Sequence, residues 1–176
     1  MRVKLTIEYD GTPFRGWAAQ PGLPTVEGAL RDALRDTFVS VENLAVAGRT
    51  DTGVHALANV VSVDVEGGPP PERIAQAVNT RLPDEIAVVV AQEVSHDFHA
   101  RFSARSRSYR YRIFQRATPS PFEQHRSWWI TRRLDEAALN RAAQLLLGEH
   151  DFRAFTPTDT QHEVFARVVD RACWIR

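Results

Sequence analysis

The order of hydrophobic patterns in the first 94 residues constrains the fold more than any other feature of this chain. Strands are expected where β-branched residues dominate or apolar residues alternate, and helices where apolar residues recur every three or four positions. The pattern predicts the order strand, helix, strand, strand, helix, strand. The segments are 3–9, 26–38, 44–47, 59–65, 72–82 and 86–94.

This order is the split βαβ arrangement of ferredoxin-like domains. We therefore expect an α+β fold whose N-terminal domain spans residues 1–97, with a mainly antiparallel sheet and helices on one face. Thr25 is expected to cap the first helix, and Pro71 stands at or near the first position of the second. A turn is expected at Asp10–Pro13.

Residues 98–176 predict a partial second α+β domain. Tyr109, Tyr111 and Ile113 alternate with arginines, which predicts a strand with one charged face and with its two tyrosines on the other. Further strands are expected at 127–131 and 164–175. Between them, Asp135 is expected to cap a helix that ends at Gly148. This helix should bury Leu139, Ala142, Ala143 and Leu146. The domain begins in this order and is not completed by the end of the sequence.

Composition limits the classes of function. The formal net charge is zero, yet the segment 99–133 carries nine arginines and one acid, Glu123, for a net charge of +8. This asymmetry favours a basic face suited to phosphates, the alternative being a solvated arginine-rich surface. Cys173 is the single cysteine, so an intramolecular disulfide and a four-thiolate metal site are excluded. We expect a reducing, cytoplasmic setting, with no signal peptide and no membrane span.

The most informative motif is AGRTDTGVHA at residues 47–56. Two glycines bracket a loop that contains Arg49 and Asp51, and His55 follows. An aspartate in a shaped loop can serve as a nucleophile, a general base or a metal ligand, and a nearby arginine favours its ionised form. The alternative is a structural loop in which Asp51 caps local amides and pairs with Arg49.

This motif resembles the signature GRTD-x-GVHA of the pseudouridine synthases that act on the anticodon arm of tRNA, and it matches at every fixed position. Further segments resemble the family in order and spacing, so the resemblance covers essentially the whole chain. These segments are Glu8–Thr12 with Phe14, Gly16 and Trp17; Thr25–Glu27; Asn79 with Leu82, Pro83 and Ile86; Phe98–Ala104 with Tyr109–Tyr111; and Gly148 with His150–Phe152 and Phe155.

The resemblance implies a pseudouridine synthase fold and the isomerisation of uridine to pseudouridine in the anticodon stem-loop, at tRNA positions 38–40. Asp51 corresponds to the nucleophile, which attacks either C6 of the base or C1′ of the ribose. Arg49 is expected to order the carboxylate, and Tyr109 to stack on the flipped uracil. Arg101 and Arg110 are expected to bind the substrate, with Arg105, Arg107 and Arg112 as further candidates. No cofactor or metal is implied. The partners are tRNA and a second copy of the chain, in a homodimer.

Several alternatives stay open. His96 and His99 could form a metal pair, although a structural role is favoured because no further ligands lie nearby. Glu8–Thr12 is similar to the D-x-D-G-T motif of haloacid-dehalogenase-type phosphatases, but Glu8 stands at the nucleophile position. The family's members continue past the length of this chain, so an inactive, truncated RNA-binding fragment is the main alternative. Ala58-Asn59 also departs from the family's usual Gly-Gln, and Ala18 from its usual Gln.

Overall fold

The computed structural model describes residues 1–156 and 163–176, which form two compact units, Met1–Tyr111 and Arg112–Arg176. Unit 1 has the predicted order of elements. They are β1 (Arg2–Tyr9), α1 (Val26–Arg35), β2 (Ser40–Val46), β3 (Ala56–Glu66), a 3-10 turn η1 (Pro71–Arg73), α2 (Ile74–Asn79) and β4 (Ile86–Val94).

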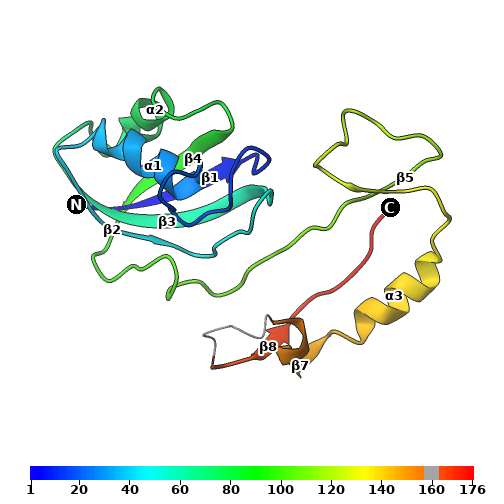
Figure 1. Cartoon of the computed structure of the whole chain (residues 1–176). Helices are drawn as coiled ribbons and strands as arrows, with labels where there is room; N and C mark the ends of the chain where they lie inside the picture. The colour runs from blue at the N-terminus through cyan, green and yellow to red at the C-terminus, as the bar shows by residue number, and fades with distance from the viewer. Residues whose placement is uncertain (157–162) are drawn as a thin grey trace. The chain divides into compact units, whose positions relative to one another are not determined.

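The four strands of unit 1 form one antiparallel sheet in the order β2-β3-β1-β4. Figure 1 shows α1 and α2 covering the same face of this sheet. Successive side chains of a strand point to opposite faces. In β1, Val3, Leu5 and Ile7 are buried, and Leu5 lies opposite Val61 of β3. The face under the helices is therefore the hydrophobic core, and Arg2, with the other alternate residues of β1, lies on the opposite face.

The two helices begin differently. Thr25 caps α1 as predicted, because its hydroxyl accepts a hydrogen bond from the Gly28 amide. The second helix is shorter than the predicted range 72–82. Its first turn is the 3-10 turn η1, and α2 ends at Asn79. The Asn79 carboxamide bonds both the amide (2.7 Å) and the carbonyl (3.0 Å) of Val88. This long-range contact ties the end of α2 to β4.

The boundary of unit 1 lies 14 residues after the one expected between the domains, because part of the following segment is bound to the sheet. The Arg2 guanidinium donates to the carbonyls of His96 (2.6 Å) and Phe98 (3.1 Å). The amide of buried Ala100 donates to Ser62 Oγ at 3.1 Å. Residues 96–100 therefore cover part of the sheet face opposite the helices. The expected division of the fold into domains at 97/98 stays a prediction.

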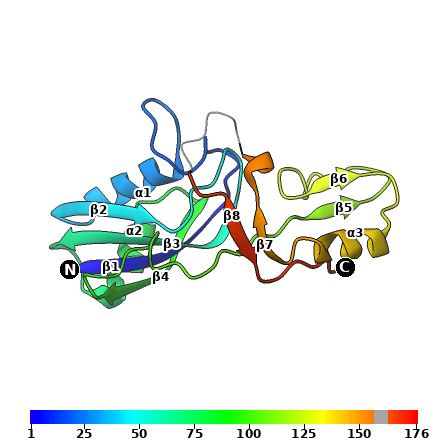
Figure 2. The same ribbon diagram turned by 90° about the horizontal axis from the view of Figure 1, so that it is seen from below.

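Unit 2 contains short elements, seen in Figure 2. Strands β5 and β6 pair in parallel, β7 and β8 pair antiparallel, and Asp135 caps α3 by accepting from the Ala138 amide. The strand β7 is absent from the sequence prediction. The elements are β5 (Ile113–Gln115), β6 (Trp128–Ile130), α3 (Glu136–Gln144), β7 (Gly148–Asp151), a 3-10 turn η2 (Arg153–Phe155) and β8 (Ala166–Val169).

Three expectations for unit 2 and its border differ from the structure. Tyr109–Arg112 is not a strand, since β5 begins at Ile113, so the expected alternation of tyrosines and arginines on two faces does not exist there. Of the four residues expected to be buried on α3, Ala143 alone is buried, and Leu146 lies beyond the end of the helix with 44% of its surface exposed. The strand expected at 164–175 is confined to β8.

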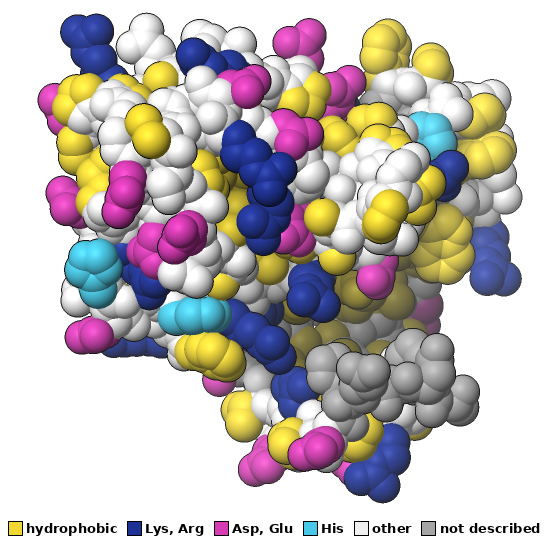
Figure 3. Space-filling view, turned by 60° about the vertical axis from the view of Figure 1, so that its left-hand side comes forward, with side chains coloured by type: hydrophobic (Ala, Val, Ile, Leu, Met, Phe, Trp, Pro, Cys, Tyr) yellow, Lys and Arg dark blue, Asp and Glu magenta, His cyan; other side chains and the backbone are white. Residues whose placement is uncertain are grey.

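The surface carries charges of both signs, and Figure 3 shows basic and acidic side chains on the same face. All nine arginines of the segment 99–133 are exposed, and Glu123 pairs with Arg112 at 3.1 Å. The side chains that carry the excess positive charge of this segment are therefore exposed to solvent. In the described residues, no helix combines the length and the apolar character needed to cross a bilayer.

Candidate active site

The motif AGRTDTGVHA begins the loop that joins β2 to β3 and ends at the first residue of β3, so the loop proper spans residues 47–55. We call it the catalytic loop because it carries Asp51, which the family resemblance makes the expected nucleophile. Asp51 and Arg49 both have exposed side chains on this loop. Within the described residues, the Asp51 carboxylate and the Arg49 guanidinium make no hydrogen bond or ion pair, with each other or with other groups. The carboxylate therefore faces solvent without an internal partner that a reacting group would have to displace.

The backbone of the catalytic loop is held from several sides. Because the loop has no regular structure, its carbonyls need donors from elsewhere in the fold. The Asn59 side chain donates to the Gly48 carbonyl (2.9 Å), and the Trp17 amide donates to the Thr50 carbonyl (2.9 Å). The Val54 amide donates to the Asp51 carbonyl at 3.2 Å, which closes a turn around the candidate nucleophile. The backbone of the loop is thus fixed although the side chains of Arg49 and Asp51 are exposed.

A buried tyrosine holds the residue before Asp51. Tyr9, at the end of β1, is 4% exposed. Its hydroxyl lies 2.8 Å from Thr50 Oγ1 and accepts a hydrogen bond from Asn59 Nδ2 at 3.2 Å. Burial raises the pKa of the Tyr9 phenol, and the bonds to Thr50 and Asn59 oppose this effect. The phenol is therefore neutral at ordinary pH and acts as a fixed hydrogen-bonding group.

Two glycines let the segment after β1 approach the catalytic loop. A Cβ on Gly11 would lie 2.1 Å from the Val54 carbonyl oxygen, so only glycine fits against this backbone. Gly16 has a φ of +90°, and a Cβ there would lie 2.9 Å from the Thr50 carbonyl oxygen. The neighbouring Trp17 is buried, and its carbonyl accepts from Glu27 in the first turn of α1. The loop is therefore packed against a segment that is itself anchored on a helix.

His55 takes part in the same contact. Its Nδ1 accepts a hydrogen bond from the Gly11 amide at 3.1 Å and also lies 3.1 Å from Asp10 Oδ1. One ring nitrogen cannot both accept from an amide and donate to a carboxylate. We assign Nδ1 as the acceptor, because the Gly11 amide has a fixed direction. Asp10 Oδ1 also accepts from the Thr12 amide and closes a turn. His55 and Asp10 thus support the loop in this structure.

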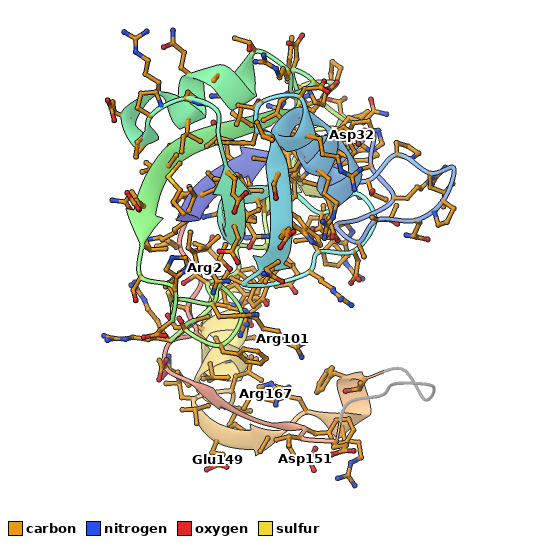
Figure 4. All side chains as sticks on the ribbon, turned by 90° about the vertical axis from the view of Figure 1, so that its left-hand side faces the viewer. Arg2, Asp32, Arg101, Glu149, Asp151 and Arg167 are labelled. Atoms are coloured by element: carbon orange, nitrogen blue, oxygen red, sulfur yellow. The ribbon has the colours of Figure 1, made fainter. Side chains whose placement is uncertain are left out.

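The other predicted site residues lie on the segment that follows β4. Figure 4 labels Arg2 in β1 and Arg101 on that segment. The Arg101 guanidinium lies 5.6 Å from the centre of the Phe102 ring. The backbone amide of Arg101 donates a hydrogen bond to His99 Nδ1 at 3.2 Å. Tyr109 is 73% exposed, and Arg110 is exposed as well.

The structure brings only some of the predicted site residues into contact with the same loop. Asp51 and Arg49 share the catalytic loop, whereas no hydrogen bond, ion pair or ring contact among the described residues joins Asp51 to Arg101, Tyr109 or Arg110. The side chain of this segment that does reach the loop is Arg107, which donates to the Ala47 carbonyl. The described residues also contain no group of three His, Cys, Asp or Glu side chains placed to bind a metal ion.

Several supporting residues were not identified from the sequence. The segment after β1 resembles the family pattern, but this resemblance gives no role to its individual residues. The segment contains Tyr9, Gly11, Gly16 and Trp17. For Asn59 the sequence shows only a departure from the family's usual glutamine. Its carboxamide bonds both the Gly48 carbonyl and Tyr9, so this departure touches the support of the catalytic loop. The signal available was the spacing of the two glycines after a strand, which permits close backbone contact.

Comparisons with known proteins show which family this chain resembles. The family described as tRNA pseudouridine synthase matches residues 5–103, which include the catalytic loop, Tyr9, Trp17 and Asn59.

Curated relatives named tRNA pseudouridine synthase A are similar over nearly the whole chain. The relative from Bradyrhizobium sp. (strain BTAi1) is 44% identical over 176 residues, which cover 99% of this chain and 72% of the relative. The relative from Rhodopseudomonas palustris (strain BisA53) has the same identity and coverage. The one from Maricaulis maris is 42% identical over 170 residues, covering 96% of this chain and 68% of the relative.

Proposed function

The chain belongs to the tRNA pseudouridine synthase family, and from this premise we propose that it converts uridine to pseudouridine in the anticodon stem-loop of tRNA, with Asp51 as the nucleophile. The observation that carries the proposal is the placement of Asp51. Its carboxylate is exposed and unpartnered among the described residues, on a loop whose backbone is bonded by Trp17 and Asn59. A nucleophile needs both access to the substrate and a fixed position.

The reaction is an isomerisation. The bond between N1 of uracil and C1′ of the ribose breaks, the base turns, and a bond forms between C5 and C1′. The proton on C5 leaves, and N1 gains a proton, so no oxidant, reductant or group donor is consumed. Asp51 supplies the carboxylate for the covalent step, and Arg49, two residues away on the same loop, is proposed to order this carboxylate when the substrate is bound.

The substrate base has to leave its stack to reach Asp51, at a cost of a few kcal/mol. An aromatic side chain offsets part of this cost, by about 1–3 kcal/mol per stacked base. We assign this role to Tyr109, which is 73% exposed. Arg101 and Arg110, exposed on the same segment, are proposed to bind the flanking phosphates.

The finer architecture is part of the same proposal. The strand order β2-β3-β1-β4, with all neighbours antiparallel and two helices on one face, supports a ferredoxin-like first domain within the pseudouridine synthase fold. A cytoplasmic homodimer that holds tRNA is proposed from the family resemblance.

Release of tritium from C5 tests the function directly. Transcripts of tRNA labelled with tritium at C5 of uridine are incubated with the wild type, Asp51→Ala, Asp51→Asn and the matched control Asp84→Ala, which removes another exposed aspartate of unit 1. We expect release by the wild type and by Asp84→Ala, and none by either Asp51 variant. Turnover by Asp51→Ala would refute the assignment of the nucleophile.

Filter binding on the same samples separates the two functional alternatives. The Asp51 variants should bind tRNA as the wild type does, because they lose no phosphate contact. Binding should weaken steeply with salt, and Arg101→Gln should lower the slope of log K against log salt by about 1. A wild type that binds tRNA without releasing tritium would establish an RNA-binding protein in place of an enzyme.

A further inference from the structure

Arg107 contacts the backbone at the first residue of the catalytic loop. Its Nε donates to the Ala47 carbonyl oxygen at 2.9 Å, and its Nη2 donates to the same oxygen. The guanidinium also lies against the next residue, since a Cβ on Gly48 would be 3.4 Å from Arg107 Nε. Arg107 is 60 residues away from Ala47 in the sequence, so this contact is a tertiary tether.

This tether completes a set of bonds along the loop. The carbonyls of Ala47, Gly48 and Thr50 accept hydrogen bonds from Arg107, Asn59 and Trp17 respectively. These donors come from three separate segments of unit 1. The three bonds fix the backbone on the N-terminal side of Asp51, and the contact of Arg107 fixes the point at which the loop leaves β2.

We propose that Arg107 is a positioning residue of the reaction. It holds the catalytic loop in a fixed position relative to its own segment, on which Tyr109 follows two residues after Arg107. This inference rests on the proposed function. The sequence placed Arg107 among candidate RNA contacts, whereas in the structure its Nε and one Nη2 hydrogen are used by the protein. Arginine suits the task because two N–H groups of its planar fork converge on one oxygen, which a lysine ammonium cannot reproduce.

The test separates positioning from RNA binding by measuring the single-turnover rate at saturating tRNA and the Kd for tRNA. Arg107→Met removes the donors at similar length, and Arg107→Lys retains the charge and one donor. The matched control is Arg81→Met, because Arg81 is also an exposed arginine that donates to a backbone carbonyl, that of Ala77 at 2.9 Å.

For Arg107→Met we expect the saturated rate to fall between about 10-fold and 100-fold, as for a displaced reacting group, with little change in Kd or in its salt slope. Arg107→Lys should recover part of the rate, and Arg81→Met should change neither quantity. A higher Kd with an unchanged saturated rate would overturn the proposal and make Arg107 a phosphate contact. Unchanged values for Arg107→Met would overturn it as well.

Hydrogen exchange keeps the tether testable without any activity. Peptides covering residues 47–55 should exchange faster in Arg107→Met than in the wild type or in Arg81→Met, while peptides from β1 keep their protection. Equal protection of the loop in all three proteins would refute the tether. A failure of the proposed function would instead show as the absence of tritium release by the wild type, whatever the exchange result.

Discussion

The pair formed by Arg2 and Asp64 should make the stability of unit 1 depend on pH. Arg2 Nε and Nη2 donate to the two carboxylate oxygens at 2.7 and 2.6 Å, and Asn43 donates to the same carboxylate. The hydrogen bond from Arg2 lowers the pKa of Asp64 from 3.8 to about 2, against the opposing effect of burial. At about 1.4 kcal/mol per pKa unit, this shift corresponds to at most about 2 kcal/mol of stability.

Solvent reduces that value. The Asp64 side chain is 24% exposed, so we expect the Asp64→Asn variant to lose about 1–2 kcal/mol of unfolding free energy at pH 7. Because the folded pKa is depressed, the stabilisation is present above pH 3.8 and is lost as the pH falls through about 2. The difference between the wild type and the variant should therefore be about half as large at pH 3 as at pH 7.

Urea denaturation followed by circular dichroism at both pH values measures this difference. The control is Asp32→Asn, which removes an exposed pair on α1: Asp32 and Arg35 lie 3.6 Å apart, with 78% and 65% of their side chains exposed. It should cost less than about 0.5 kcal/mol. The reasoning fails if Asp64→Asn costs no more than Asp32→Asn at pH 7, or if its effect does not shrink at pH 3.

Three further changes test the support of the catalytic loop and of α1. Tyr9→Phe should lower the unfolding free energy by about 1–2 kcal/mol in urea titrations, because Thr50 loses its hydrogen-bond partner. Because burial raises the pKa of Tyr9, the wild type should also lose stability as the pH rises above 10. Gly11→Ala should cost about 1–3 kcal/mol and slow tritium release, because its Cβ would meet the Val54 carbonyl; a fully active, equally stable variant would contradict this packing. Thr25→Ala should cost about 1 kcal/mol in the same titrations without changing the rate at saturating tRNA.

Local signals in the sequence predicted the elements of unit 1 well. The capping residue Thr25 accepts a hydrogen bond from an amide only three residues away. The alternation of apolar residues in β1 predicts which side chains of the same strand are buried. The bounds of β4 are those expected, and the α+β class follows from the order of elements. These features depend on neighbours in the chain, so a single sequence carries them.

The errors have a different origin. The segment around Tyr109 and Tyr111 has the alternation of a strand but is not part of any sheet in the described residues, and a pattern cannot supply a partner strand. The second helix stops at Asn79, whose side chain is bonded to Val88, a residue that the helical pattern does not include. In β2, the left-handed Asn43 coincides with a break in the register opposite β3, and this strand begins earlier than expected.

The candidate site follows the same division. The sequence predicted that Asp51 lies on a loop between two strands, because the motif is contiguous. It did not predict how the loop is held, because the supports come from Tyr9, Trp17, Asn59 and Arg107, which converge only after folding. All of these supports lie within Met1–Tyr111. The bonds that Arg107, Asn59 and Trp17 make to the loop are therefore formed within unit 1, and we infer that folding of this unit brings these supports to Asp51.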